Sequence, residues 1–259
     1  MLELHIADQR YIKLIRKWLK SKILNPDGTV EILEKGTPQG GVISPVLANI
    51  YLHYALDLWF EKKVKPHMRG EIIICRYADD VVCTFQYRDD AERVKQALGA
   101  RLEKFGLELS EEKTRLIKFT RFNKQQSGSF DFLGFTFRWE SSRNGKDIVT
   151  HKTRVQKSRS TIKEIATWMR KSRNFRLNKF FKELNDKLRG HYNYFGIVGN
   201  MESLRKVEKA VKRLTYKWLN RRSQRKSFNW KEFAQVIVRY ELVKPFINRP
   251  DQRVRLNYC

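Results

Sequence analysis

Two adjacent carboxylates lie between two apolar runs in the segment IIICRYADDVVCTF, residues 72–85. Asp79 and Asp80 repel each other, and burying them is costly unless a cation or hydrogen-bond donors compensate their charge. Carboxylate oxygens are the hard ligands that Mg²⁺ prefers, and Mg²⁺ completes its shell with water and substrate phosphates. The pair therefore indicates a divalent-metal site for phosphate chemistry. The simpler alternative is an ordinary polar turn, because Asp favours turns.

The elements around this pair must hold it at a turn. Apolar and β-branched residues on both sides favour two strands, so the segment predicts a hairpin with the acids at its tip. Upstream, Ser44 followed by Pro45 predicts a helix N-cap and first turn. Apolar residues at helical spacing from Val46 to Leu58 predict that this helix is long and buried.

Further elements make the first half a mixture of α and β structure. A helix is predicted over residues 11–20, and a hairpin over residues 23–33 around an Asp-Gly turn. After the carboxylate hairpin, Asp90 is the predicted N-cap of another helix and Gly106 its C-terminal stop. The segment FDFLGFTFRW, residues 130–139, has a strand pattern.

The net charge points to a polyanionic partner. The chain has 54 Lys and Arg against 28 Asp and Glu, a net charge of +26. Residues 1–140 have 23 basic and 19 acidic residues, whereas residues 141–259 have 31 basic and 9 acidic residues. Aromatic residues are interleaved with the basic residues of the second half, which favours nucleic acid over a membrane surface.

Several classes of protein are excluded by composition. No apolar run approaches the length of about 18 residues that a membrane span needs, and the first ten residues lack the design of a secretory signal. Three Cys and five isolated His support neither a disulfide framework nor a zinc site. A cytoplasmic protein without membrane association is expected.

The second half is expected to be helical. It follows the polar segment ESSRNGKD, residues 140–147, which we interpret as a linker or a surface loop, with a domain boundary after residue 140. Helices are predicted near residues 154–172, 177–195, 201–221 and 229–241.

The third of these helices has an apolar stripe and a basic face. Its predicted core stripe is Leu204, Val207, Val211, Leu214 and Trp218. Basic residues on its other faces can meet successive phosphates of an RNA, although such a run is often only a solvated surface. The predicted RNA-binding residues are Lys206, Lys209, Lys212, Arg213 and Lys217.

Several motifs of the sequence resemble those of one protein family. YADD in its hairpin resembles the catalytic motif of reverse transcriptases, and GTPQGGVISPVLANIYL resembles the preceding motif of group II intron reverse transcriptases. GLELSEEKT resembles the lysine-bearing motif that follows, FDFLGFTF the primer-grip region, and LRGHYNYFG the maturase domain. The resemblance implies an α+β palm subdomain of a right-hand polymerase over residues 1–140, followed by an all-α thumb/maturase domain over residues 141–259.

The resemblance also implies an activity and its residues. The chain would be an RNA-directed DNA polymerase that uses two Mg²⁺ ions, with Mn²⁺ as a substitute, and that binds intron RNA to assist splicing. Its other partners would be an RNA template with a DNA primer, and dNTPs. The implied residues are Asp79 and Asp80 for the metals, Lys113 for catalysis, Gln39, Gly40, Gly41 and Tyr77 for nucleotide and template, and Leu133 and Gly134 for the primer grip.

One family motif has no counterpart in the sequence. The family carries another aspartate in a segment resembling D-[IL]-K-x-x-F-D, before the first helix here, and the fingers are also lacking. The chain is therefore expected to be a C-terminal portion that is weak as a polymerase alone and needs a separate or upstream fingers and palm segment. Two alternatives remain open: an inactive RNA-binding maturase, and a retron-type or defence-associated reverse transcriptase.

Overall fold

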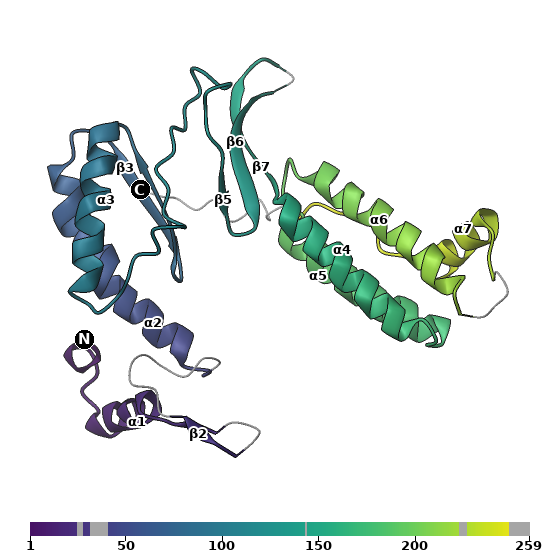
Figure 1. Ribbon diagram of the computed structural model, residues 1–259, viewed down its shortest axis with the longest axis horizontal. Coiled ribbons are helices and arrows are strands. Elements are labelled where there is room, and N and C mark those ends of the chain that lie inside the picture. The colour runs from purple at the N-terminus through teal and green to yellow at the C-terminus, as the bar shows by residue number, and fades with distance from the viewer. Residues whose placement is uncertain (25–27, 32–40, 143, 223–226, 249–259) are drawn as a thin grey trace. The chain divides into compact units, whose positions relative to one another are not determined.

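The chain folds into two compact units, Met1–Leu116 (unit 1) and Ile117–Cys259 (unit 2). Each unit has its own helices, strands and buried apolar cluster in the computed structural model (Figure 1). The structure describes residues 1–24, 28–31, 41–142, 144–222 and 227–248.

Unit 1 mixes helices with two antiparallel hairpins. Its elements are η1 (Leu2–Leu4), α1 (Gln9–Leu19), β1 (Ile23–Leu24), β2 (Val30–Glu31), α2 (Ser44–Leu52), η2 (His53–Asp57), η3 (Phe60–Val64), η4 (Lys65–His67), β3 (Ile72–Tyr77), β4 (Asp80–Phe85) and α3 (Arg88–Glu103). The first predicted helix is α1, and Asp8 caps it by accepting the backbone N–H of Arg10 at 2.8 Å. The predicted hairpin is β1–β2, whose turn residue Gly28 has a φ of +84°.

The helix that follows Ser44 differs from its prediction. Ser44 is the first helical residue and Ile43 occupies the N-cap position, and no residue of α2 is buried. Beyond α2 the helix widens into the π-helical turns η2 and η3, and its apolar side chains enter the core only there, with Phe60 at 1% exposure. The predicted long helix is confirmed as a continuous helical segment from Ser44 to Val64, but its first part, α2, is not buried as predicted.

The hairpin β3–β4 confirms the predicted strand, turn and strand. Its register runs from the pair Ile72 and Phe85 to the pair Tyr77 and Asp80. Ile72 packs into the small core of this part of unit 1 together with Phe60, Val64 and Val94. The strands are thus held from one face by the π-helical turns and by α3.

Helix α3 begins earlier than its prediction. Tyr87 is the N-cap, and Asp90 lies in the first turn, where its fully buried carboxylate accepts the backbone N–H of Arg69 at 3.1 Å. Asp90 therefore anchors the segment before β3 rather than capping α3. Gly106 has a φ of +64° just beyond the helix, as a C-terminal stop requires.

A three-stranded antiparallel sheet opens unit 2. Its strands are β5 (Phe130–Phe132), β6 (Phe135–Ser141) and β7 (Asp147–Thr153), in the order β5-β6-β7. Ser141 at the end of β6 pairs with Asp147 at the start of β7, so the described residues of ESSRNGKD connect two strands of one sheet. This agrees with the predicted surface loop and not with a linker between domains. The proposed boundary after residue 140 falls within β6, and residues 141–259 include β7, so this half is not all-α.

Four helices follow at the predicted positions, to within two residues. They are α4 (Val155–Ser172), α5 (Leu177–Phe195), α6 (Met201–Leu219) and α7 (Trp230–Arg239), and α4 packs lengthwise along α6 (Figure 1). A cluster of fifteen buried apolar residues joins these helices to the sheet. The predicted stripe of α6 is buried at Leu204, Val207 and Val211, and Leu214 and Trp218 are partly buried against the same cluster. The fully buried positions beyond Val211 are Thr215 and Leu219. Among the described residues, no helix combines the length and the apolar character of a membrane span.

Candidate active site and nucleic-acid interface

Asp79 and Asp80 lie at the tip of the β3–β4 hairpin. Tyr77 pairs with Asp80, so Ala78 and Asp79 form a two-residue connection. Ala78 has a φ of +53°, which tight hairpin turns require of their first residue and which costs a residue with a Cβ about 1 kcal/mol. The turn places one carboxylate in the loop and the next at the start of β4.

Both carboxylates are exposed at the tip of the hairpin, so the structure imposes no burial cost on them. Neither side chain makes a hydrogen bond or ion pair with another described residue. No group of three or more His, Cys, Asp or Glu that could hold a metal ion occurs in the described ranges. The apolar flanks therefore stabilise the hairpin and leave the two acids accessible to a cation.

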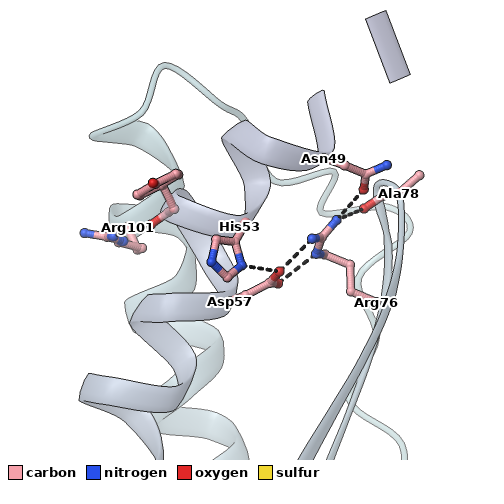
Figure 2. A network of polar contacts seen from close by, with 7 residues as sticks. Asn49, His53, Asp57, Arg76, Ala78 and Arg101 are labelled. Atoms are coloured by element: carbon pink, nitrogen blue, oxygen red, sulfur yellow. Dashed lines mark hydrogen bonds and ion pairs between the residues drawn. The ribbon is translucent and has the colours of Figure 1, made fainter. Parts of the chain in front are cut away.

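Arg76 links this turn to the preceding helix (Figure 2). Its guanidinium donates to both carboxylate oxygens of Asp57, at 2.7 and 2.6 Å, and to Oδ1 of Asn49 at 2.8 Å. It also donates to the carbonyl oxygen of Ala78 at 3.0 Å. Only 13% of the Arg76 side chain is exposed, so these charge-assisted bonds lie largely out of water. One side chain thus ties the residue before Asp79 to both α2 and η2.

The π-helical turn η2 presents Asp57 to Arg76. The hydrogen bond from Arg76 is the main cause that holds the pKa of Asp57 below its ordinary value, and His53 Nδ1, 3.4 Å away, acts in the same direction. From α3, the Arg101 guanidinium donates to two carbonyl oxygens of η2, at 2.8 and 3.1 Å (Figure 2). A side chain that binds helix carbonyls in this way supports the wider turn.

Sequence reasoning missed Asn49, Asp57 and Arg76, although a signal was present. Arg76 is a single charge in an apolar strand, and Asp57 is a single acid in an apolar helix. A charge on an apolar segment needs a partner when its neighbours are buried, so the two opposite charges could have been paired. The spacing could not show that both side chains face the same side, because that depends on the π turn.

The structure describes two of the four residues predicted to bind nucleotide and template, Gly41 and Tyr77. Gln39 and Gly40 lie outside the described residues. The carbonyl of Gly41 accepts the backbone N–H of Ser44 at 3.1 Å, which joins this glycine to the first turn of α2. Tyr77 is 65% exposed beside the carboxylate turn, so its ring is accessible to a ligand.

Lys113 lies in a turn beyond α3. Its backbone N–H donates to the carbonyl of Ser110 at 3.2 Å, and its side chain is exposed. Within the described part of unit 1, the Lys113 side chain forms no ion pair with Asp79 or Asp80. The structure therefore leaves its catalytic role as a proposal.

The predicted primer-grip residues form a second tight turn, between β5 and β6 of unit 2. Leu133 and Gly134 have φ of +50° and +79°, and their carbonyls accept from the Tyr194 hydroxyl at 3.0 Å and the Arg154 N–H at 2.9 Å. A Cβ at Gly134 would lie 3.3 Å from the ring of Phe195, so the position needs glycine both for its backbone and for space. The turn is fixed to both flanking helices, α4 and α5.

The basic residues of α6 fall into two groups. Lys206 pairs with Glu202 at 2.8 Å and Lys212 with Glu208 at 2.6 Å, so two of the predicted RNA-binding lysines already have an acidic partner. Of the five predicted RNA-binding residues, three are exposed and form no ion pair with a described carboxylate: Lys209, Arg213 and Lys217. These three are the better candidates for phosphate contacts.

Two family models match the two halves of the chain. The reverse transcriptase (RNA-dependent DNA polymerase) family matches residues 2–137, more than half of the chain. The group II intron, maturase-specific domain matches residues 155–235. The two matched segments together contain the hairpin β3–β4 and the helix α6. The chain belongs to the reverse transcriptases, in the group II intron reverse transcriptase/maturase family.

Individual relatives agree with this assignment. The chain is 24% identical over 285 residues to the group II intron-encoded protein LtrA of Lactococcus lactis subsp. cremoris, covering 79% of this chain and 46% of LtrA. It is 27% identical over 182 residues to protein YkfC of Escherichia coli, covering 60% of this chain and 46% of YkfC. An uncharacterized 91 kDa protein in the cob intron of Schizosaccharomyces pombe is 49% identical over 61 residues, 24% of this chain and 7% of that protein. The chain thus spans about half the length of LtrA and YkfC, and far less of the third.

Proposed function

We propose that this chain provides the metal-binding carboxylates and an RNA-binding surface of a group II intron RNA-directed DNA polymerase that also assists splicing. The observation that carries the proposal is the β3–β4 hairpin, which exposes two adjacent carboxylates at a tip fixed by Arg76. This hairpin lies inside the segment that matches the reverse transcriptase family.

The donor set of the turn fits Mg²⁺. Asp79 and Asp80 offer hard oxygen ligands that no described cation engages, and Mg²⁺ accepts such carboxylates with water and phosphate oxygens. Mn²⁺ has the same ligand preference and is expected to substitute. Two ions bound there supply charge stabilisation for the attacking 3′ hydroxyl and the leaving pyrophosphate. Asp79 and Asp80 hold the ions, and Arg76 keeps the turn in place.

Other residues are assigned to the substrates. Tyr77 contacts the primer end, and Lys113 donates a proton to the pyrophosphate or neutralises its charge. The remaining proposed contacts are Gln39, Gly40 and Gly41 with nucleotide and template, and Leu133 and Gly134 with the primer. dNTPs, an RNA template and a DNA primer are the substrates, and another polypeptide segment contributes the fingers and a third aspartate.

Unit 2 is proposed to bind intron RNA as thumb and maturase domain. The reverse transcriptase match ends at residue 137 and the maturase match begins at residue 155, which supports a domain boundary after residue 140. The packing of the structure divides the chain earlier, after Leu116. The unpaired cations of α6 project from a helix whose other face is buried, so they can stay in register with successive phosphates.

Primer extension on an RNA template tests the metal site. Asp79→Asn is expected to lower Mg²⁺-dependent extension at least about a hundredfold, and to weaken Mn²⁺ binding measured by electron paramagnetic resonance. Asp89→Asn is the matched control, because Asp89 is also an exposed acid of unit 1 and pairs with Arg69 instead of facing the turn.

Measurable primer extension that is equal for the wild type and Asp79→Asn would refute the catalytic assignment. A chain that binds intron RNA, extends no primer and binds Mn²⁺ equally well with and without Asp79 would instead support the inactive RNA-binding maturase.

Charge reversal tests the RNA-binding surface. Lys209→Glu with Arg213→Glu should weaken intron RNA binding and reduce the slope of log affinity against log salt by roughly two, because two phosphate contacts are lost. Lys206→Glu with Lys212→Glu is the matched pair, since both lysines are already paired with glutamates. A larger loss of RNA affinity in the Lys206 and Lys212 variant than in the Lys209 and Arg213 variant would contradict the assignment of phosphate contacts to Lys209 and Arg213.

A further inference from the structure

Trp230 is an exposed tryptophan whose ring is rigidly held. Its indole stacks on the ring of Tyr216, with centroids 3.9 Å apart and planes at 11°. Both rings contact the buried Phe233 edge-on, at 5.3 Å for Tyr216 and 5.8 Å for Trp230. Trp230 nevertheless remains 56% exposed. Tyr216 therefore covers one face of the indole, and the rest of the ring is accessible.

The backbone on both sides of this aromatic pair is also fixed. Asn220, the C-cap of α6, exchanges two hydrogen bonds with the backbone of Phe228, at 2.7 and 3.0 Å. Asn229 caps α7 in a reciprocal capping box with Glu232, at 2.9 and 2.8 Å. Trp230 is the first residue of α7, so its position is already fixed. A ligand that stacks on its ring therefore has little conformational entropy to overcome in the protein.

Two cations of α6 lie on the same side of the helix as the aromatic pair. Lys209 and Arg213 precede Tyr216 by seven and three residues, which places all three on one side of the helix. Both are exposed, and neither forms an ion pair with a described carboxylate. Lys231 is exposed next to Trp230, whereas the carboxylate of Glu232 is used in the capping box. The surroundings of the ring are suited to a polyanion that also carries flat apolar groups.

We infer that Trp230 is a stacking site for an unpaired RNA base, with the phosphates of the same strand on Lys209 and Arg213. The inference rests on the proposed RNA-binding role of unit 2 and gives it a ligand class, single-stranded RNA. A base in a loop or bulge has a free π-face and stacks on aromatic side chains, whereas a base inside a duplex is already stacked. The Tyr216 ring extends the stack on the protein side.

The test combines removal of the ring with removal of the base. The full chain is titrated into a labelled single-stranded oligoadenylate, into a series in which one abasic site replaces each position in turn, and into an RNA duplex. Binding is measured by fluorescence anisotropy for the wild type, Trp230→Ala, Trp230→Phe and Val238→Ala. Val238 is the control because it is exposed on the same helix, at 76%, and is not part of the stack.

Trp230→Ala is expected to weaken binding of the intact strand about tenfold, Trp230→Phe less, and Val238→Ala not at all. For the wild type, an abasic site at one position of the strand should weaken binding about as much as Trp230→Ala weakens binding of the intact strand. The affinity of Trp230→Ala should not depend on whether that position carries a base. Duplex affinity should not change. Equal weakening of intact, abasic and duplex RNA by Trp230→Ala would overturn the inference, since it would indicate a structural role.

The outcomes also separate this inference from the proposed function. If strands bind through Lys209 and Arg213 but no abasic position matters, only the stacking site is refuted. If the wild type binds no RNA, or binds it independently of Lys209 and Arg213, the RNA-binding role of α6 is refuted together with the stacking site.

Discussion

The two units hold their candidate functional residues in different ways. In unit 2 the basic face of α6 is the outer side of a helix whose inner side belongs to a cluster of fifteen buried apolar residues. Among the described residues of unit 1, the cluster beside the carboxylate hairpin contains four buried residues, and the turn itself is held by the polar contacts of Arg76. The RNA-facing cations thus depend on apolar packing, while the acidic turn depends on one charged side chain.

The difference suggests what each surface needs. A phosphate-binding helix face tolerates small displacements, because lysine and arginine side chains are long and phosphate contacts carry no base identity. Metal ligands must be held within about half an ångström, and directional bidentate hydrogen bonds supply that precision better than apolar contacts do. Removing apolar packing should therefore affect unit 2 most, whereas removing polar contacts should affect the carboxylate turn of unit 1.

The largest stability effect is expected in the core of unit 2. Leu184 is fully buried in α5, and Leu184→Ala should cost about 4 kcal/mol because it leaves a cavity in a dense cluster. Leu102→Ala in α3 of unit 1 is the matched change, at 8% exposure, and should cost about 2 kcal/mol. Urea unfolding, with hydrogen exchange by mass spectrometry to locate the loss, measures both. Equal costs would remove the contrast between the two cores.

Mild acid should affect unit 2 before unit 1. Burial in α5, with a smaller contribution from Lys157, lowers the pKa of His191 from 6.5 to about 4. The unfolded chain therefore binds this proton first, and unit 2 should lose on the order of 2 kcal/mol as the pH falls from 6.5 to 4. The pKa of Asp57 is lowered below 3.8, so its contribution to unit 1 is present above that value and is lost only below it.

His191→Phe isolates this effect. Urea unfolding of the wild type and His191→Phe at pH 7 and pH 4.5 should show a smaller loss of stability for the variant. A loss of the same size in both proteins would assign the acid sensitivity to other groups.

A smaller effect is expected from Arg76→Lys. Lysine cannot bind both oxygens of Asp57 and also reach Asn49 and the Ala78 carbonyl, so the hairpin should lose about 1–2 kcal/mol of local stability. Hydrogen exchange of residues 72–85 measures it. Arg88→Lys is the control, because the Arg88–Glu92 pair is exposed to solvent and its change should leave exchange of these residues as in the wild type. If both variants exchange like the wild type, the network does not hold the turn.

The smallest effect, and one of opposite sign, is expected from Ala78→Gly. Glycine relieves the left-handed φ of +53° but adds freedom to the unfolded chain, which leaves a gain of roughly 0.5 kcal/mol. Ala48→Gly in the exposed helix α2 should instead cost about 1 kcal/mol. Thermal unfolding compares the two. A loss of stability at Ala78 would mean that the turn is unstrained.

Local patterns predicted the parts of the fold that depend on neighbouring residues. The apolar and β-branched runs around Asp79 and Asp80 predict the hairpin, because such residues favour strands. The spacing of Leu204, Val207 and Val211 predicts the buried face of α6, because backbone geometry sets the period of a helix. What the sequence alone could not give depends on partners far along the chain. The Arg76 network needs the phase of a π-helical turn, which no local pattern indicates.

The wide turns of η2 and η3 have a consequence for how this segment can change. Each holds one more residue per hydrogen-bonded loop than an α-helical turn, so deleting a single residue here would restore ordinary winding and rotate everything downstream by about 100°. Val64, which follows Lys63, would then leave the core. Substitution at exposed Lys62 or Lys63 would be tolerated while loss of one residue at the same place would not, so the length of this segment is under tighter constraint than its composition.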